Sequence, residues 1–262
     1  MSRWRKSGAA GDTAFATALY NLGFLYALER RDKQACDHLR ESLRVTESAL
    51  VADPEALVGS LNVLGILVER KLCSGKPKGP EGARPLYHRA VLVSEKTLIT
   101  NHPLRALSLE TYARVLDRTG QSKEGGAPYR ILATNIRRRI IQKLEEEDAG
   151  ITPQTAAKEA LPAAAPVEYV KPPVVTSPRI VFKRELEYSG LARLAAQQGT
   201  AVFSLVVGEQ GKARDVRLLK GVGFGLDEQA YFALRSWKFE PGTKEGKPVA
   251  VMATVEANFR LR

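Results

Sequence analysis

The run Thr200-Ala-Val-Phe-Ser-Leu-Val-Val207 and the run Ala213-Arg-Asp-Val-Arg-Leu-Leu-Lys220 decide the fold of the C-terminal part of this chain. The first is apolar and rich in residues that favour strands. The second alternates small or apolar residues with charged ones, which is the two-residue period of a half-buried strand. Gly208 to Gly211 lies between them and supplies a turn. These residues predict two strands joined as a hairpin.

A helix and a further strand complete this region. The run Leu226–Trp237 has a helical period, and Asp227 and Glu228 lie in its first turn, where the helix dipole favours acids. One face of this helix is apolar: Leu226, Ala230, Ala233, Leu234 and Trp237. Residues 241–248 break the chain, and residues 249–261 form a second long β-type run. We therefore expect a small α+β domain, a three-stranded antiparallel sheet with a helix packed on it.

Several spaced motifs in this region carry a resemblance. In order, they are Leu226-Asp227, Ala230, Trp237-Lys-Phe239-Glu-Pro241-Gly242, Gly246-Lys-Pro-Val249 and Asn258-Phe259-Arg-Leu261. Together they resemble the C-terminal domain of the TonB family, bacterial energy transducers that reach across the periplasm to outer-membrane receptors. The resemblance covers about residues 178–262. It implies a periplasmic or cell-envelope location, with a TonB-dependent outer-membrane receptor and inner-membrane motor proteins as partners.

The resemblance also implies a peptide site on the last strand. In the family, this strand receives the short "TonB box" of a receptor, and an open sheet edge offers unpaired N–H and C=O groups to such a peptide. Residues just before the first strand assist, which here are Glu187 and Tyr188; the family's following proline is replaced by Ser189. We assign Trp237, Phe239 and Pro241 to the core beneath the edge. The expected edge residues are Val249, Val251, Ala253, Thr254, Val255, Ala257 and Phe259.

Residues 13–147 contain an internal repeat. Residues 60–70 echo residues 108–118 at an offset of 48 (108 − 60), and Asn21-Leu-Gly23 aligns with Val63-Leu-Gly65 at an offset of 42 (63 − 21). Such repeats indicate an all-α helical-hairpin solenoid that resembles tetratricopeptide repeats, with about three units. Pro54 and Pro103 fit the first turn of restarted helices. The expected helices lie near 13–29, 32–51, 55–72, 81–99, 103–119 and 123–147.

Four tyrosines of the repeats have two interpretations. They could line a groove for a peptide of unknown identity on the concave face, or they could pack between helices, as aromatic residues at helical spacing usually do. These residues are Tyr20, Tyr26, Tyr87 and Tyr112.

The domain organisation follows from a change in composition. Residues 1–147 form the predicted helical repeats, and residues 178–262 form the predicted C-terminal domain. Between them, residues 148–177 are rich in proline and alanine, which predicts a semi-rigid spacer.

Composition and motifs argue against several function classes. The net charge of +11 is spread over both ends of the chain, which suits weak attraction to acidic surfaces better than a nucleic-acid groove. No catalytic triad or zinc motif occurs, so we expect no enzyme, no metal and no cofactor. The glycine-rich run 221–225 lacks phosphate-loop spacing. Cys36 and Cys73 permit a disulfide, but two residues cannot establish one, and Cys36-Asp37-His38 is poorly arranged for a shared ion.

The sequence predicts no signal peptide and no membrane helix. Apolar runs such as Val63–Val68 are far short of the roughly 20 residues that span a bilayer. Because TonB-type transducers normally carry an N-terminal membrane helix, three explanations stay open: a truncated chain, export by other means, or a soluble derivative. The alternative function is a soluble two-module adaptor that holds peptides without transmitting force.

Overall fold

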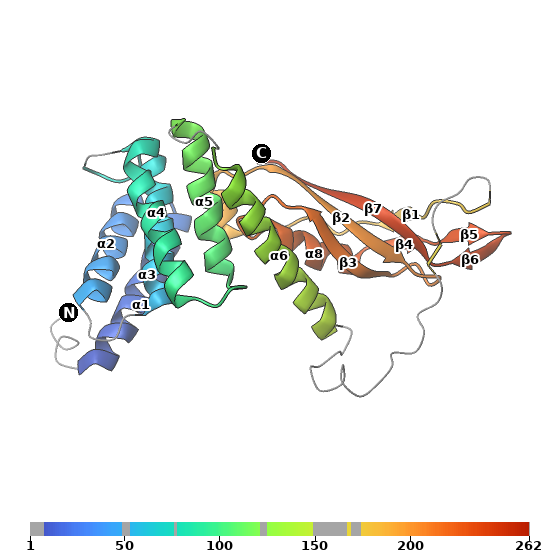
Figure 1. The fold of residues 1–262 in the computed structure, drawn as a ribbon, viewed down its shortest axis with the longest axis horizontal. Coiled ribbons are helices and arrows are strands. Elements are labelled where there is room, and N and C mark those ends of the chain that lie inside the picture. The colour runs from blue at the N-terminus through green and yellow to red at the C-terminus, as the bar shows by residue number, and fades with distance from the viewer. Residues whose placement is uncertain are drawn as a thin grey trace. The chain divides into compact units, whose positions relative to one another are not determined.

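A computed structural model describes residues 8–48, 53–75, 78–120, 125–148, 167–168 and 174–261 (Figure 1). The chain divides into two compact units. The first comprises Met1–Ile136 with Arg193–Ala196, and the second comprises Arg137–Ala192 with Gln197–Arg262. The division falls inside a helix, and most of the expected spacer, residues 149–166 and 169–173, lies outside the described residues.

The N-terminal part is helical, as the repeat pattern predicts. Neighbouring helices in sequence pack side by side, α1 on α2, α3 on α4 and α4 on α5 (Figure 1). No helix in the described part of the chain has both the length and the hydropathy needed to span a membrane. The helices are α1 (Gly8–Leu28), α2 (Asp32–Ser48), α3 (Pro54–Glu69), α4 (Gly79–Thr97), α5 (Pro103–Thr119) and α6 (Ala127–Asp148).

Two of these helices begin with a capping residue followed by proline. The Asp53 carboxylate accepts hydrogen bonds from the backbone N–H groups of Glu55 and Ala56, and Pro54 fills the first turn of α3. At α5, the His102 ring accepts from the N–H of Leu104, ahead of Pro103. These caps accept hydrogen bonds from backbone N–H groups that have no partner within the helix. The helix starts predicted at Pro54 and Pro103 are therefore confirmed.

The small residues of the repeat lie where its helices approach closely. A side chain at Gly23 would lie 2.8 Å from Leu39, and one at Gly65 would lie 2.4 Å from the Tyr87 ring. Both distances are too short for a Cβ atom, so only glycine allows these helix pairs to pack at this separation. The two aligned glycines, 42 residues apart in sequence (65 − 23), therefore have the same structural role.

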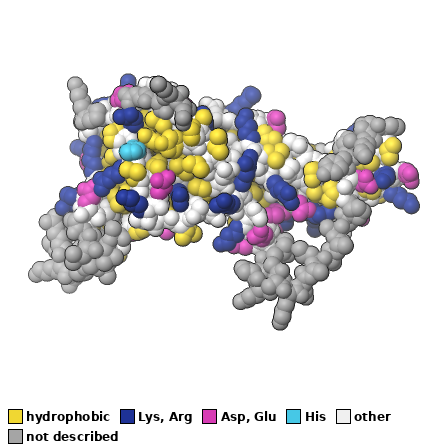
Figure 2. All heavy atoms as spheres, in the orientation of Figure 1, with side chains coloured by type: hydrophobic (Ala, Val, Ile, Leu, Met, Phe, Trp, Pro, Cys, Tyr) yellow, Lys and Arg dark blue, Asp and Glu magenta, His cyan; other side chains and the backbone are white. Residues whose placement is uncertain are grey.

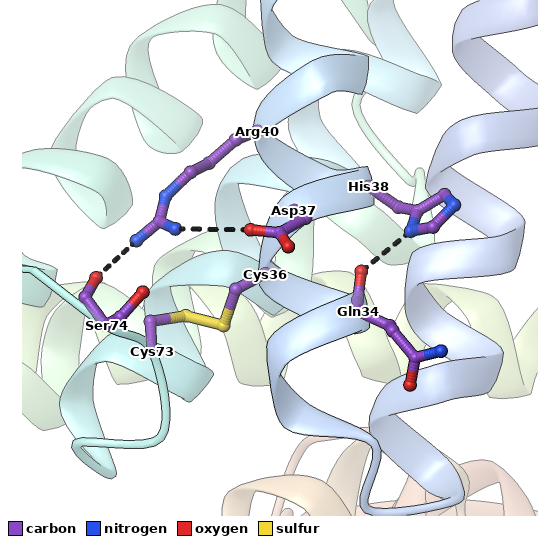
Figure 3. Close-up of a disulfide and its surroundings, with 7 residues drawn as sticks. All are labelled: Gln34, Cys36, Asp37, His38, Arg40, Cys73 and Ser74. Atoms are coloured by element: carbon purple, nitrogen blue, oxygen red, sulfur yellow. Dashed lines mark hydrogen bonds and ion pairs between the residues drawn. A yellow bond between two sulfur atoms is a disulfide. The ribbon is translucent and has the colours of Figure 1, made fainter.

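A disulfide joins the first and second helical hairpins. Cys36 on α2 is bonded to Cys73, which follows α3, and the two Cα atoms are 5.8 Å apart (Figure 3). Beside it, Arg40 donates to the carbonyl of Ser74 at 2.8 Å. His38 points away from the disulfide and contacts the carbonyl of Gln34. The Cys36 thiol is therefore consumed by the disulfide and not offered to a metal ion.

The C-terminal unit contains the expected three-stranded antiparallel sheet. Its strands are β2 (Gly199–Val207), β3 (Ala213–Lys220) and β7 (Val251–Phe259), in the spatial order β3-β2-β7. Helix α8 (Leu226–Ser236) contacts β2 and β3. The predicted order of strand, strand, helix, strand is confirmed.

Short elements surround this sheet. Strand β1 (Arg179–Phe182) pairs with β4 (Lys238–Glu240), and β5 (Gly242–Lys244) forms a hairpin with β6 (Lys247–Val249). A short helix, α7 (Gly190–Ala195), precedes β2. Each of these elements is too short to show a repeating pattern of apolar and polar residues, which is why the sequence did not predict them.

The core of this unit lies between the sheet and α8. Trp237 and Phe239 are buried there, as expected, whereas Pro241 is half-buried. The Trp237 ring N–H donates to the carbonyl of Arg184, so the buried indole keeps a hydrogen-bond partner.

In the glycine-rich loop before α8, the backbone N–H groups bind the carboxylate of Asp227 from the same chain. The buried Asp227 carboxylate accepts from the backbone N–H groups of Val222 and Gly223, at 2.7 and 3.1 Å. A phosphate at this helix N-terminus would need the same donors. The loop therefore stabilises the start of α8 with a side chain of the helix itself.

Candidate peptide-binding edge

The sheet β3-β2-β7 has two outer edges, one on β3 and one on β7. An outer strand directs every second N–H and C=O pair away from the sheet, and these groups can pair with another chain. The two edges differ in what already occupies those groups.

Side chains cover the outer edge of β3. Arg138 on α6 donates to the carbonyls of Leu218 and Leu219, at 3.0 and 2.5 Å. Glu145, further along α6, accepts from the N–H of Val216, and Arg235 of α8 donates to the carbonyl of Ala213. A register shift in the β2–β3 pairing at this point makes both leucine carbonyls available to one guanidinium.

Ion pairs and hydrogen bonds hold α6 in that position. Arg137 is almost fully buried and pairs with Glu228 of α8 at 2.6 Å. Tyr231 and Arg235 of α8 both contact Glu145, at 2.9 and 3.4 Å, and Arg235 also pairs with Asp148. Burial and the bond to Glu145 raise the pKa of Tyr231 above its ordinary value of 10.0, which favours the protonated hydroxyl that donates this hydrogen bond. This end of α6 is thus an integral part of the C-terminal unit.

The outer edge of β7 is different. The carbonyl of Ala250 and the N–H of Met252 point outward, because both bond to the backbone of Glu168, which does not belong to the sheet. Pairing between β7 and β2 continues without a register shift from Val251 to Phe259, so even-numbered residues direct their backbone groups outward and odd-numbered ones toward β2. In the part of the chain that the structure describes, no backbone hydrogen bond reaches this edge from Thr254 to Asn258.

This geometry coincides with a match to a known family. Residues 184–261 match the family model described as Gram-negative bacterial TonB protein C-terminal. Over 93 residues the chain is also 30% identical to Protein TonB of Vibrio cholerae serotype O1 (strain ATCC 39315 / El Tor Inaba N16961), a stretch that is 35% of this chain. Residues 184–261 are a TonB C-terminal domain. The chain spans only 38% of the length of that relative.

The expected edge residues of the TonB C-terminal domain need a correction. Val249 does not belong to the last strand, because it pairs with Gly242 in the β5–β6 hairpin and Ala250 separates the two strands. The other odd-numbered residues direct their side chains into the core or toward it: Val251, Val255, Ala257 and Phe259 are buried, and Ala253 is half-buried. Their backbone N–H and C=O groups face β2, so these groups pair within the sheet and are not available to a partner strand.

The residues that face outward are Met252, Thr254, Glu256 and Asn258, and all four side chains are exposed. Only Thr254 was among the expected site residues. The sequence Val251-Met-Ala-Thr-Val-Glu-Ala-Asn-Phe259 places most of its polar residues at alternate positions, which predicts the exposed side chains but not the direction of the main-chain groups. The even-numbered set has the main-chain groups that strand addition requires.

Tyr188 lies at the far end of β7. Its ring packs edge-to-face on Phe259, with ring centroids 5.6 Å apart, and burial raises the pKa of its hydroxyl. Glu187 is exposed and pairs with Arg184. Ser189 accepts from the N–H of Ala192 and donates to the carbonyl of Phe224, which fixes the start of α7. At the position where the family has proline, Ser189 therefore holds the segment that leads into β2 through these two hydrogen bonds.

The four repeat tyrosines do not form one cluster. Tyr87 is fully buried and donates to Glu69 at 2.8 Å, as the packing interpretation predicts. Tyr20 packs beside Gly59, and Tyr26 contacts His38. The Tyr112 ring contacts the His88 ring in a tilted arrangement and the Tyr129 ring edge-to-face.

Glu69 is the centre of a buried polar cluster. Its side chain is 1% exposed and accepts from Tyr87 and from two arginines, Arg114 at 2.6 Å and Arg118 at 2.7 Å. These partners come from α4 and α5, so one carboxylate links three helices. Tyr87 therefore stabilises the stack and is not a groove residue.

Proposed function

We propose that the TonB C-terminal domain captures an extended segment of a partner protein as an added strand along β7. The partner strand pairs with the outward N–H and C=O groups of Thr254, Glu256 and Asn258. By the family resemblance, the partner is a TonB-dependent outer-membrane receptor, and the chain couples energy to transport across the outer membrane.

One observation carries this proposal: the two edges of the sheet are unequal. The β3 edge is occupied by Arg138, Glu145 and Arg235, whereas the described residues leave the β7 edge open from Thr254 to Asn258. A peptide that adds to this sheet therefore has one available side, and it is the strand that the family uses.

The disulfide supports a cell-envelope location. Disulfides persist in oxidising compartments such as the bacterial periplasm and are rare in the cytosol. The bond between Cys36 and Cys73 fits a periplasmic chain. The charge distribution agrees with a protein-binding role, because Lys and Arg side chains are scattered over the face seen in Figure 2 and do not gather in one stripe, as a nucleic-acid groove would require.

We propose a separate protein-binding role for the helical repeats, since such stacks typically bind peptides. Apolar side chains cover much of the N-terminal unit on the face seen in Figure 2. Inner-membrane motor proteins are candidate partners by resemblance. A two-module adaptor without force transmission makes the same contacts, and only transport assays in cells separate the two.

The test uses a fluorescein-labelled peptide containing the TonB box of a TonB-dependent receptor from the same genome, with fluorescence anisotropy as the readout. Glu256→Pro removes an outward N–H from β7, and we expect it to weaken binding by about tenfold or more. The matched control Glu256→Ala removes the same side chain and keeps the N–H, so its affinity should stay near that of the wild type. Equal affinity of the proline and alanine variants would refute main-chain capture at this edge.

A further inference from the structure

A segment of the same chain already occupies the start of the β7 edge. The N–H of Glu168 donates to the carbonyl of Ala250 at 2.8 Å, and the N–H of Met252 donates to the carbonyl of Glu168 at 3.1 Å. Glu168 thus forms a parallel bridge with Val251. These bonds are the same kind that an added partner strand would make.

A side-chain contact holds this segment in place. The Glu168 carboxylate pairs with Lys244 of β5 at 2.8 Å, and both side chains are partly exposed. Nearby, the N–H of Thr176 donates to the carbonyl of Thr243, so a second piece of the region before the domain also lies along the β5–β6 hairpin. The chain is therefore also held at a second point, eight residues after Glu168 (176 − 168).

The contact is weak enough to be exchanged. Two main-chain hydrogen bonds and one partly exposed ion pair each contribute little net stability in water. Its strength comes from the tether, which keeps the segment at high local concentration beside the edge. A partner strand that pairs only from Thr254 to Asn258 leaves it in place, whereas one that extends toward Val251 must displace it.

We propose that Val167–Glu168 is a built-in occupant of the capture edge, and that a partner strand displaces it in order to pair along the whole of β7. This inference rests on the proposed function of that edge and adds its regulation. Release of Val167–Glu168 makes the start of β7 available and tightens capture.

The experiment measures binding of the same labelled TonB-box peptide to the full chain. Glu168→Pro removes the donor to Ala250, and Glu168→Gln keeps that donor while breaking the ion pair with Lys244. We expect tighter binding by about three- to tenfold for Glu168→Pro and a smaller gain for Glu168→Gln. Glu245→Gln is the matched control, because it removes the same charge from the turn of the β5–β6 hairpin, and its affinity should not change.

Amide exchange gives a second readout that needs no peptide. In the free wild-type chain, the Met252 amide should exchange more slowly than the Thr254 amide, because only Met252 donates to Glu168. In Glu168→Pro, the Met252 rate should rise toward that of Thr254. Equal rates in the wild type would mean that the segment does not occupy the edge, and the inference would fall.

The outcomes separate the two proposals. If the peptide binds the wild type and Glu168→Pro with equal affinity, the occupant has no effect on capture and only this inference fails. If the peptide binds neither protein, capture at β7 fails, and its regulation fails with it. Tighter binding together with faster exchange at Met252 supports both.

Discussion

The hydroxyl of Tyr231 on α8 donates a 2.9 Å hydrogen bond to the carboxylate of Glu145 on α6. The two residues are 86 positions apart in sequence, and the expected spacer lies between them. The same carboxylate also accepts from the N–H of Val216, on the outer edge of β3. Glu145 therefore joins α6 to both the helix and the sheet of the C-terminal unit.

Loss of this carboxylate should destabilise the C-terminal unit. Glu145→Ala leaves the Tyr231 hydroxyl and the Val216 N–H without their acceptor, which should lower the free energy of unfolding by about 1–3 kcal/mol. Urea unfolding followed by Trp237 fluorescence, in a Trp4→Phe background, reports on this unit alone because the chain has two tryptophans. Glu146→Ala, at the next and exposed position, is the control and should change little. Equal losses for the two variants would mean that Glu145 contributes nothing through Tyr231 and Val216.

Proline substitutions along β7 should distinguish the residues whose N–H groups face β2 from those whose N–H groups face outward. Val255→Pro removes an N–H that faces β2, so it should destabilise the fold by about 2 kcal/mol or more. Thr254→Pro removes an outward N–H and should cost clearly less stability while it reduces peptide capture. Thermal unfolding of both variants tests the assignment, and a larger loss for Thr254→Pro would reverse it.

The sequence predicted those helices and strands that are long enough to show a repeating pattern of apolar and polar residues. The runs 200–207 and 213–220 and the helix from Leu226 all lie where alternation or a helical stripe placed them. The strand at residues 251–259 was also predicted, and its docking residues were placed along it by position from the family resemblance. Most of those docking residues are odd-numbered, and in the structure the odd-numbered residues are the ones whose backbone groups face β2.

Other features depend on contacts that no local pattern encodes. Arg138 reaches the carbonyl of Leu218 across 80 positions of sequence, and nothing in Arg137-Arg-Arg139 distinguishes such a contact from a solvated face. The disulfide requires Cys36 and Cys73 to meet, which depends on how the first two helical hairpins pack. Glu168 sits in a proline-rich stretch whose composition predicts a spacer and not a strand partner.

The buried carboxylate of Glu69 should be essential to the helical stack. Glu69→Gln removes the charge that balances Arg114 and Arg118, and breaking a buried pair in this way costs about 3 kcal/mol or more. Circular dichroism at the helix band during urea unfolding measures the change. Glu95→Gln, at an exposed position of α4, is the matched control and should stay within about 0.5 kcal/mol of the wild type. A Glu69→Gln protein as stable as this control would show that the cluster does not stabilise the stack.

Reduction of the disulfide should destabilise the first two helical hairpins. The bond closes a loop between residues 37 positions apart, and a loop of this size stabilises a fold by about 2–4 kcal/mol. The Tm of the helical signal should therefore fall when dithiothreitol is added. The double variant Cys36→Ser/Cys73→Ser should start from the lower Tm and respond to no reductant. A wild-type Tm that is unchanged by full reduction, verified by thiol labelling, would contradict this prediction.

Stability at alkaline pH should depend on Tyr87. Burial raises the pKa of its hydroxyl well above the ordinary value of 10.0; the charge of Arg114 opposes this rise, and the charge of Glu69 and the bond to it add to it. The folded state therefore retains the proton while the unfolded chain releases it near pH 10, so stability is intact below that pH and declines as the pH rises above it. In Tyr87→Phe this titration is absent, and the free energy of unfolding should fall less steeply between about pH 9.5 and 11. Lysines that lose their charge in this range are common to both proteins and cancel in the difference. Parallel pH slopes for the two proteins would mean that Tyr87 ionises as readily in the folded state as in the unfolded chain.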